Sequence, residues 1–245
     1  DRVTTWEGLI KSVRAKVKGT KVKIRLGASS GEWKAMVADE AARTTFAKNI
    51  KTVLEKNKLD GIDLDFEWAE NEKEYKDYSL AILKMREVLG DKYLFSVSLH
   101  PVCYKISKEA IEAVDFISLQ CYGPSPVRFP IEKYCSDIQM VLEYGIPKEK
   151  LVAGVPFYGV TKDNSKKTEA YFNFVQNGLV TSPAQNEVIY QGDTYVFDGQ
   201  DNIRIKTRYA KEQKLKGMMS WDLATDLPLS DSRSLLKTMT EELRE

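Results

Sequence analysis

Histidine, cysteine pairs and long apolar runs are scarce in this chain of 245 residues, and each scarcity excludes a class of function. The lone histidine, His100, excludes any site that needs two histidines, and a Ser-His-Asp triad would have to use it. The three cysteines are odd in number and form no C-x-x-C pair, so a zinc or redox site is not expected. No apolar run approaches the roughly 18 residues that would span a membrane.

An excess of either charge is also absent. The formal net charge is +1, so the chain shows no electrostatic footprint for nucleic acid. A content of 42% hydrophobic and 30% charged residues fits one globular domain, 1–245, and α/β barrels commonly have this length. The chain opens with Asp1-Arg2-Val3-Thr4-Thr5, which is not a signal peptide, although a leader could have been removed.

The most informative segment is the acidic stretch Asp60–Glu67. Asp63, Asp65 and Glu67 are spaced by two, which places their side chains on one face of a β-strand. The opposite face is apolar and can be buried, with Ile62, Leu64 and Phe66. Three carboxyl groups this close cannot all ionise at neutral pH, so at least one is expected to keep its proton. A carboxyl group that stays protonated can act as a general acid.

Two other interpretations of this stretch compete with acid catalysis. Acids that alternate with apolar residues often mark a half-exposed strand with a solvated face. Clustered carboxylates also bind calcium or magnesium, but the spacing is not that of an EF-hand loop and a strand encircles a cation poorly. The flanking Trp68 and the turn pair Asp60-Gly61 favour a functional site, and no metal is expected.

Helical and strand-like patterns alternate along the chain, which indicates βαβ units and a parallel sheet. Strands are predicted at 21–26, 61–67, 93–99, 116–122, 151–157 and 217–221. Helices are predicted at 4–17, 40–56, 72–89, 107–113, 131–144, 204–214 and 232–243, with a short helix near 168–176 and a hairpin across Gln191-Gly192-Asp193. A closed (β/α)8 barrel needs eight strands. Either two strands precede Asp1, or the sheet is open.

These segments together resemble a family 18 glycoside hydrolase of the chitinase type. The stretch Asp60–Glu67 matches that family's D-x-x-D-x-D-x-E signature at every named position. Weaker matches to the third, sixth, seventh and eighth barrel strands follow in the right order, at Lys21–Gly31, Gln120-Cys121-Tyr122, Leu151–Gly159 and Gly217–Trp221. The resemblance implies an α/β fold, a (β/α)8 TIM barrel whose first two strands are absent from this chain.

The resemblance also implies roles for individual residues in a retaining, substrate-assisted hydrolysis. Glu67 would protonate the glycosidic oxygen, Asp65 would hold the N–H of the substrate's 2-acetamido group, and Asp63 would share a proton with Asp65. Tyr122 would donate a hydrogen bond to the acetamido oxygen, and Trp221 would form a platform under the reacting sugar. No cofactor is implied.

Other residues are candidates for substrate binding. Tyr158 and Trp68 are expected to line sugar subsites, although core or rim packing would explain both of them at least as well. Gln120 is expected to contact the sugar, and the alternative is that it only satisfies a buried polar neighbour. Tyr122 and Trp221, taken alone, would more often be core aromatics, but both end predicted strands, where barrel sites lie.

Two departures from the commonest pattern bear on the substrate. Gly123 stands where many chitinases carry an acid, and Gln120 resembles the plant-type and endo-β-N-acetylglucosaminidase branches. The segment between the last two barrel strands is expected to be too short for the α+β insertion of processive chitinases, which predicts a shallower cleft and endo-type cleavage.

An endo-chitinase is therefore the leading prediction. The alternative is an endo-β-N-acetylglucosaminidase that cuts the chitobiose core of N-glycans, and an alternative of another class is a non-catalytic chitin- or glycan-binding protein. Retention of all three acids argues against pure binding. The expected partner is a polysaccharide or glycan that contains N-acetylglucosamine, and neither nucleic acid nor a membrane. We expect a monomer that is secreted or associated with the cell envelope.

Overall fold

The computed structural model of this chain describes residues 2–29, 31–122, 130–163 and 167–245. The chain divides into two compact units, each described here by itself. The first comprises Asp1–Leu99 and Lys105–Ile117, and the second comprises His100–Tyr104 and Ser118–Glu245. The single catalytic barrel domain inferred from the sequence stays a prediction.

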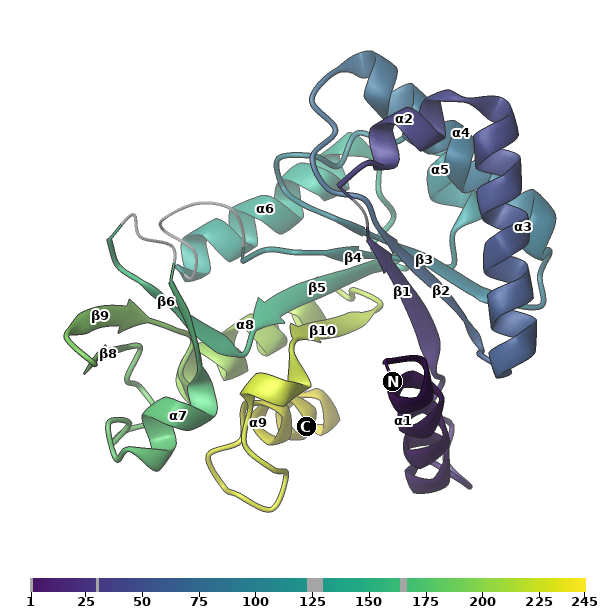
Figure 1. The fold of residues 1–245 in the computed structure, drawn as a ribbon. Helices are drawn as coiled ribbons and strands as arrows, with labels where there is room; N and C mark the ends of the chain where they lie inside the picture. Colours follow the sequence, from purple (N-terminus) through teal and green to yellow (C-terminus); the bar gives the residue numbers. More distant parts are fainter. Residues whose placement is uncertain (1, 30, 123–129, 164–166) are drawn as a thin grey trace. The chain divides into compact units, whose positions relative to one another are not determined.

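Three parallel strands form the centre of the first unit (Figure 1). They are β1 (Arg25–Ser29), β2 (Gly61–Asp65) and β3 (Leu94–Leu99), with β2 in the middle. The register pairs Asp63 with Gly27 on one side and with Ser96 on the other. The middle strand thus holds its acids between two neighbours, while its apolar side chains are fully buried on the other face.

Helices that follow these strands in the sequence cover their apolar side, and three of them begin at a side-chain cap (Figure 1). The side chains of Asp39, Asn71 and Ser107 each accept a hydrogen bond from a backbone N–H of the helix that follows. The helices of this unit are α1 (Arg2–Lys16), α2 (Trp33–Ala38), α3 (Glu40–Asn57), α4 (Glu72–Leu89) and α5 (Lys108–Ala113). The predicted helix 72–89 is confirmed at both ends.

The second unit contains the parallel pair β5 (Leu151–Pro156) and β10 (Gly217–Trp221). The short strand β4 (Phe116–Leu119) crosses the boundary between the units. The helices here are α6 (Ile131–Tyr144), α8 (Gln200–Glu212) and α9 (Leu235–Arg244), and the 3-10 helix η1 (Leu223–Thr225) follows β10. The predicted strand 217–221 and helix 131–144 are both confirmed.

A separate antiparallel sheet lies between β5 and β10 in the sequence. Its order is β7-β6-β9-β8, built from β6 (Tyr158–Thr161), β7 (Thr168–Ala170), β8 (Glu187–Tyr190) and β9 (Asp193–Val196), and the helix α7 (Tyr171–Gln176) adjoins it. The hairpin predicted across Gln191-Gly192-Asp193 is present, and its two-residue turn consists of Gln191 and Gly192, which both have positive φ. The expectation that this segment is too short for an α+β insertion is therefore wrong, because it forms a small one.

Three strand predictions have a bound that is wrong by two residues or more. The segment 21–26 pairs only from Arg25 onward, and Val22 is exposed, because the register with β2 begins at Arg25 and Gly61. The predicted strand 61–67 ends at Asp65, and the predicted strand 116–122 ends at Leu119. The predicted helix 168–176 begins at Tyr171, since the three residues before it pair as β7.

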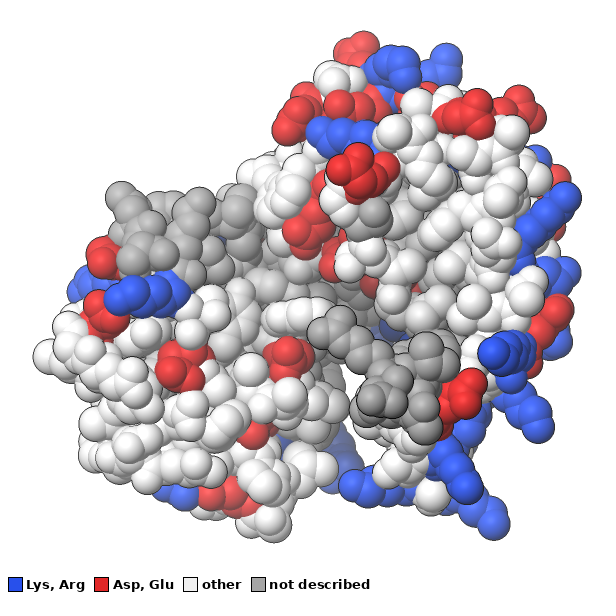
Figure 2. Space-filling view, in the orientation of Figure 1, with Lys and Arg blue, Asp and Glu red and all other residues white. Residues whose placement is uncertain are grey.

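The surface carries charges of both signs. Figure 2 shows acidic and basic side chains scattered over the visible face, in keeping with a net charge of +1. Within the described ranges, no helix combines the length and apolarity needed to cross a bilayer.

Gly61 offers a test of the β2–β3 packing. A Cβ at this position would lie 2.0 Å from the carbonyl oxygen of Leu94, a backbone atom that cannot swing away. Gly61→Ala is expected to lower the free energy of unfolding by about 3 kcal/mol or more in urea titrations. Gly27→Ala is the matched control, because a Cβ there meets nothing within 4 Å, and its change should stay within about 0.5 kcal/mol. Equal stability of the two variants would contradict the packing described.

Candidate functional site

The acid row, defined as Asp63, Asp65 and Glu67, keeps the predicted alternation. All three residues are half-buried, whereas the apolar residues between them are 0–3% exposed, namely Ile62, Leu64 and Phe66. Asp63 and Asp65 lie on β2, and Glu67 lies two residues beyond the strand. The row therefore runs out of the carboxyl end of a parallel strand, where the sites of α/β barrels are found.

The Asp63 carboxylate is held by side chains of both neighbouring strands. Ser98 donates its hydroxyl to Oδ2 at 2.8 Å, and Ser96 donates its hydroxyl to Oδ1. The Arg25 guanidinium lies 3.7 Å from Oδ1. These contacts fix the orientation of Asp63 directly behind Asp65 in the strand, since each donor comes from a fixed register position.

Arg25 is itself packed on three sides. Its guanidinium donates to the Ser96 hydroxyl and lies over the ring of Phe116, with 4.6 Å between the carbon Cζ and the ring centroid. Burial lowers the pKa of this guanidinium, and the nearby carboxylates of Asp63 and Asp115 act in the opposite direction. An arginine remains charged at neutral pH in such a setting, so the acid row has a cation beside it.

Trp33 fixes the segment that carries Glu67. Its indole Nε1 donates a hydrogen bond to the Glu67 carbonyl oxygen at 2.6 Å, and its ring stacks on Phe66 at 5.6 Å between centroids. Trp68 follows with a φ of 71°, which turns the chain away immediately after the acid. The Glu67 backbone is therefore anchored although it lies outside the strand.

The second unit brings the predicted tyrosines and glutamine together. The Tyr122 hydroxyl donates to the Gln120 Oε1 at 3.0 Å and lies 3.8 Å from the Met219 sulfur. The rings of Tyr122 and Tyr158 meet edge to face, with 6.4 Å between centroids. Both Gln120 and Tyr122 are buried, in the turn that follows β4. Gly123, the predicted departure from the family pattern, lies outside the described residues.

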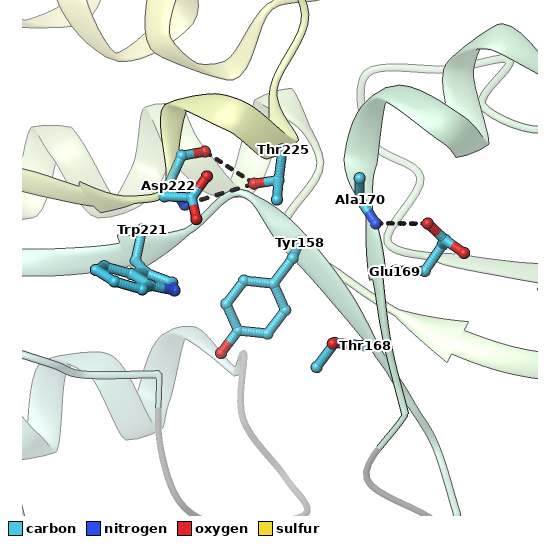
Figure 3. Close-up of a pocket in the computed structure, with 7 residues that line it drawn as sticks. All are labelled: Tyr158, Thr168, Glu169, Ala170, Trp221, Asp222 and Thr225. Carbon is cyan, nitrogen blue, oxygen red and sulfur yellow. Dashed lines mark hydrogen bonds between the residues drawn. The ribbon is translucent and has the colours of Figure 1, made fainter. Parts of the chain in front are cut away.

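Tyr158 also borders an open pocket of about 300 Å³ next to Trp221 (Figure 3). Trp221 is 55% exposed, an unusual fraction for so large an apolar side chain at a strand end. The other lining residues are polar or small: Thr168, Glu169, Ala170, Asp222 and Thr225. Aromatic faces bordered by hydroxyl and carboxylate groups suit a sugar ring, which has apolar faces and a polar rim.

The polar rim of this pocket is held by local hydrogen bonds. The Thr225 hydroxyl donates to the carbonyl oxygen of Asp222 at 2.8 Å, and the Asp222 carboxylate accepts from the Ala224 N–H. Glu169 accepts the backbone N–H of Ala170, which turns its carboxylate away from the pocket (Figure 3). Among the described residues, no group of three or more His, Cys, Asp or Glu side chains could hold a metal ion.

The predicted site residues thus fall into two clusters. The acid row and Trp68 lie in the first unit, whereas Gln120, Tyr122, Tyr158 and Trp221 lie in the second. The sequence did not single out the residues that hold the acid row, namely Arg25, Ser96, Ser98 and Trp33. Two serines at alternate positions of an otherwise apolar strand were the available signal for Ser96 and Ser98.

Comparison with known proteins gives a consistent result. Residues 5–226 match the family described as Glycosyl hydrolases family 18. A curated relative, the probable chitinase 2 of Drosophila melanogaster, is 23% identical over 273 aligned positions, which cover 84% of this chain and 56% of that protein. The chain spans about half the length of the curated relatives that it matches, between 42% and 65% in the first three.

Solved structures share the fold. A chitinase from Bacteroides thetaiotaomicron has a TM-score of 0.84 and 21% identity over 95% of this chain and 80% of its own. A chitinase-like agglutinin from Robinia pseudoacacia has a TM-score of 0.81 and 18% identity, with 98% and 86% covered. A GH18 chitinase from Cycas revoluta, solved with (GlcNAc)3, has a TM-score of 0.78 and 20% identity, with 98% and 85% covered. The α/β fold expected from the sequence is confirmed, whereas a count of eight strands stays a prediction.

Cys121 gives a chemical test of this region, because it lies between Gln120 and Tyr122 in the sequence. Burial raises the pKa of its thiol to about 12, so only about one molecule in ten thousand carries a thiolate there at pH 8. We expect Cys121 to resist alkylation by iodoacetamide in the native protein and to react once urea unfolds it, as followed by peptide mass mapping. Rapid native labelling of Cys121, in a sample shown to be folded by circular dichroism, would contradict its burial.

Proposed function

This chain belongs to family 18 of the glycosyl hydrolases, and on that premise we propose that it hydrolyses β-1,4-linked N-acetylglucosamine glycosides, with chitin oligomers as the leading substrate. The observation that carries the proposal is the acid row, which keeps all three acids on one face of β2 and its extension. Anchoring of Asp63 by two serine hydroxyls, and of the Glu67 backbone by Trp33, supports a row built to hold a fixed geometry.

In the proposed reaction Glu67 donates a proton to the glycosidic oxygen, and the C–O bond to the leaving sugar breaks. The carbonyl oxygen of the substrate's own 2-acetamido group attacks the anomeric carbon and forms an oxazolinium ion. Asp65 accepts a hydrogen bond from the acetamido N–H and offsets the positive charge. Glu67 then takes a proton from a water molecule, whose oxygen attacks the anomeric carbon and opens the oxazolinium ring. The product therefore keeps the anomeric configuration of the substrate. This route is the substrate-assisted exception among glycosidases.

The second unit supplies the sugar contacts in this proposal. The single hydroxyl proton of Tyr122 goes to Gln120 Oε1 in this structure, and Tyr122 would turn that donor to the acetamido oxygen of a bound sugar. Trp221, with 55% of its surface exposed, would lie against the apolar face of the reacting sugar. Tyr158 borders both groups, through its ring contact with Tyr122 and through the pocket that it shares with Trp221. Trp68, which follows the acid row in the first unit, is kept as a candidate for a further sugar subsite.

Chitin is favoured over the N-glycan core because the relatives reported above are named chitinases or chitinase-like. The small α+β insertion between β5 and β10 removes the sequence argument for a shallow cleft, so endo-type cleavage is no longer favoured over cleavage from a chain end. Since such substrates occur mainly outside cells, we propose a secreted or envelope-associated protein.

A binding protein without catalysis is the second candidate, favoured by the fold shared with the chitinase-like agglutinin. Such a protein would bind the same oligosaccharides that contain N-acetylglucosamine. The retained acid row favours the hydrolase, because a site that only binds has no need of three carboxyl groups on one face of a strand and its extension.

Glu67→Gln tests the role of the acid. We expect hydrolysis of an N-acetylglucosamine hexamer to fall by about a hundredfold to ten-thousandfold, because the amide cannot donate the proton. Binding of the hexamer, measured by calorimetry, should stay within a few fold. Glu70→Gln is the matched control, since Glu70 lies three residues further on and is exposed, and it should retain full activity. Unchanged turnover in Glu67→Gln would refute the assignment.

Product analysis separates the substrates. The hexamer and a high-mannose glycoprotein are incubated in parallel and examined by mass spectrometry. We expect oligomers of two to four sugars from the hexamer alone, because the acetamido-assisted mechanism requires N-acetylglucosamine at the cleavage point. A released glycan that leaves one N-acetylglucosamine on the protein would assign the endo-β-N-acetylglucosaminidase alternative. Binding of the hexamer with no product would assign the binding protein.

A further inference from the structure

Arg25 brings a positive charge to the acid row, and no step of the proposed reaction uses it. We propose that Arg25 is a positioning residue, which holds Asp63 in place together with Ser96 and sets the pH range in which the acid row works. The inference rests on the proposed function for its kinetic readout, and a second readout is independent of turnover.

The strand register explains how Arg25 reaches Asp63. Asp63 pairs with Gly27, which has no side chain, and Arg25 lies two residues earlier on the same face of β1. Its guanidinium therefore approaches Asp63 from the amino-terminal side, while Asp65 lies on the carboxyl-terminal side of Asp63. Cation, carboxylate and catalytic acids follow one another along the strand direction.

Packing alone does not call for an arginine at this position. The side chain lies over Phe116, a contact that an apolar residue such as methionine could also make. Half-buried ion pairs contribute little net stability, because desolvation offsets their attraction. What an apolar residue cannot supply is a positive charge together with donors that reach Ser96 and Asp63.

The surrounding charges leave this cation directed at the acid row. On β2 it faces Asp63, with Asp65 and then Glu67 further along, and β3 presents the neutral Ser96 and Ser98. In the part of the chain that the structure describes, the other carboxylate that acts on Arg25 is that of Asp115, next to β4. Asp115 already accepts hydrogen bonds from Arg86, at 2.9 Å, and from the Phe95 N–H, at 2.7 Å. Lys23 pairs instead with Asp60, at 3.9 Å.

The sign of the expected effect follows from the charge. A cation stabilises the ionised form of nearby carboxyl groups. Its removal makes ionisation of the acid row less favourable, so each carboxyl group there should titrate at a higher pH. Both limbs of the pH profile of kcat/KM should then move to higher pH, because one limb reports the carboxylate that must be ionised and the other reports the acid that must be protonated.

The test compares pH profiles for hydrolysis of the N-acetylglucosamine hexamer by the wild type and its variants. Arg25→Met and Arg25→Gln are expected to shift both limbs upward by about half a pH unit or more. Arg25→Lys, which keeps the charge, should restore the wild-type limbs. Arg86→Met is the matched control, because it removes an arginine that also pairs with an aspartate and lies over a phenylalanine ring, but whose partner Asp115 is outside the acid row. Its limbs should not move.

A carboxyl-carbon NMR titration of the same proteins, with no substrate, gives the second readout. The titration midpoints of the acid row should rise in whichever of Arg25→Met and Arg25→Gln is folded by circular dichroism. If the wild type hydrolyses nothing, the proposed function fails and the NMR midpoints alone judge the role of Arg25. Unmoved midpoints and limbs in a folded variant, with loss of stability only, would overturn the inference and leave Arg25 as a structural residue.

Discussion

The proposed chemistry of this protein depends on how one carboxylate, that of Asp63, is held between two neighbouring strands. Serine hydroxyls from β3 reach both of its oxygens, and a guanidinium from β1 lies beside one of them. Because the donors come from fixed register positions, Asp63 has little freedom to rotate. Asp65 and Glu67 follow on the same face, so the row begins at a carboxylate whose orientation is fixed.

Much of the first unit could be predicted because burial enforces a period of two. The alternation of acids with Ile62, Leu64 and Phe66 is visible in the sequence, and the structure buries one set and leaves the other half-buried. The helix 72–89 was equally predictable, since Asn71 caps its start and Gly90 follows its end. Local signals and long-range packing agree at these places.

The predicted strand 21–26 was misplaced for an equally physical reason. Val22, Ile24 and Leu26 alternate as a strand should, but their pattern does not say which residues find a partner. Pairing begins only at Arg25, because Asp60 reaches back and accepts the Ile24 N–H at 2.8 Å just before the register starts. Register is a property of two segments far apart in the sequence. For the same reason the contacts of Arg25, Ser96 and Trp33 with the acid row could not be predicted.

Trp221 and Trp33 differ in their exposure to solvent, and their fluorescence should differ as a result. Trp33 is 2% exposed, stacked in the core and hydrogen-bonded, whereas Trp221 is 55% exposed beside an open pocket. Indole emission lies further to the red when the ring meets water, so these two residues should contribute at different wavelengths. With Trp6 and Trp68 replaced by phenylalanine, Trp33 would act as an internal standard, and a sugar that covers Trp221 would report its own arrival at the red edge of the spectrum, with no label attached.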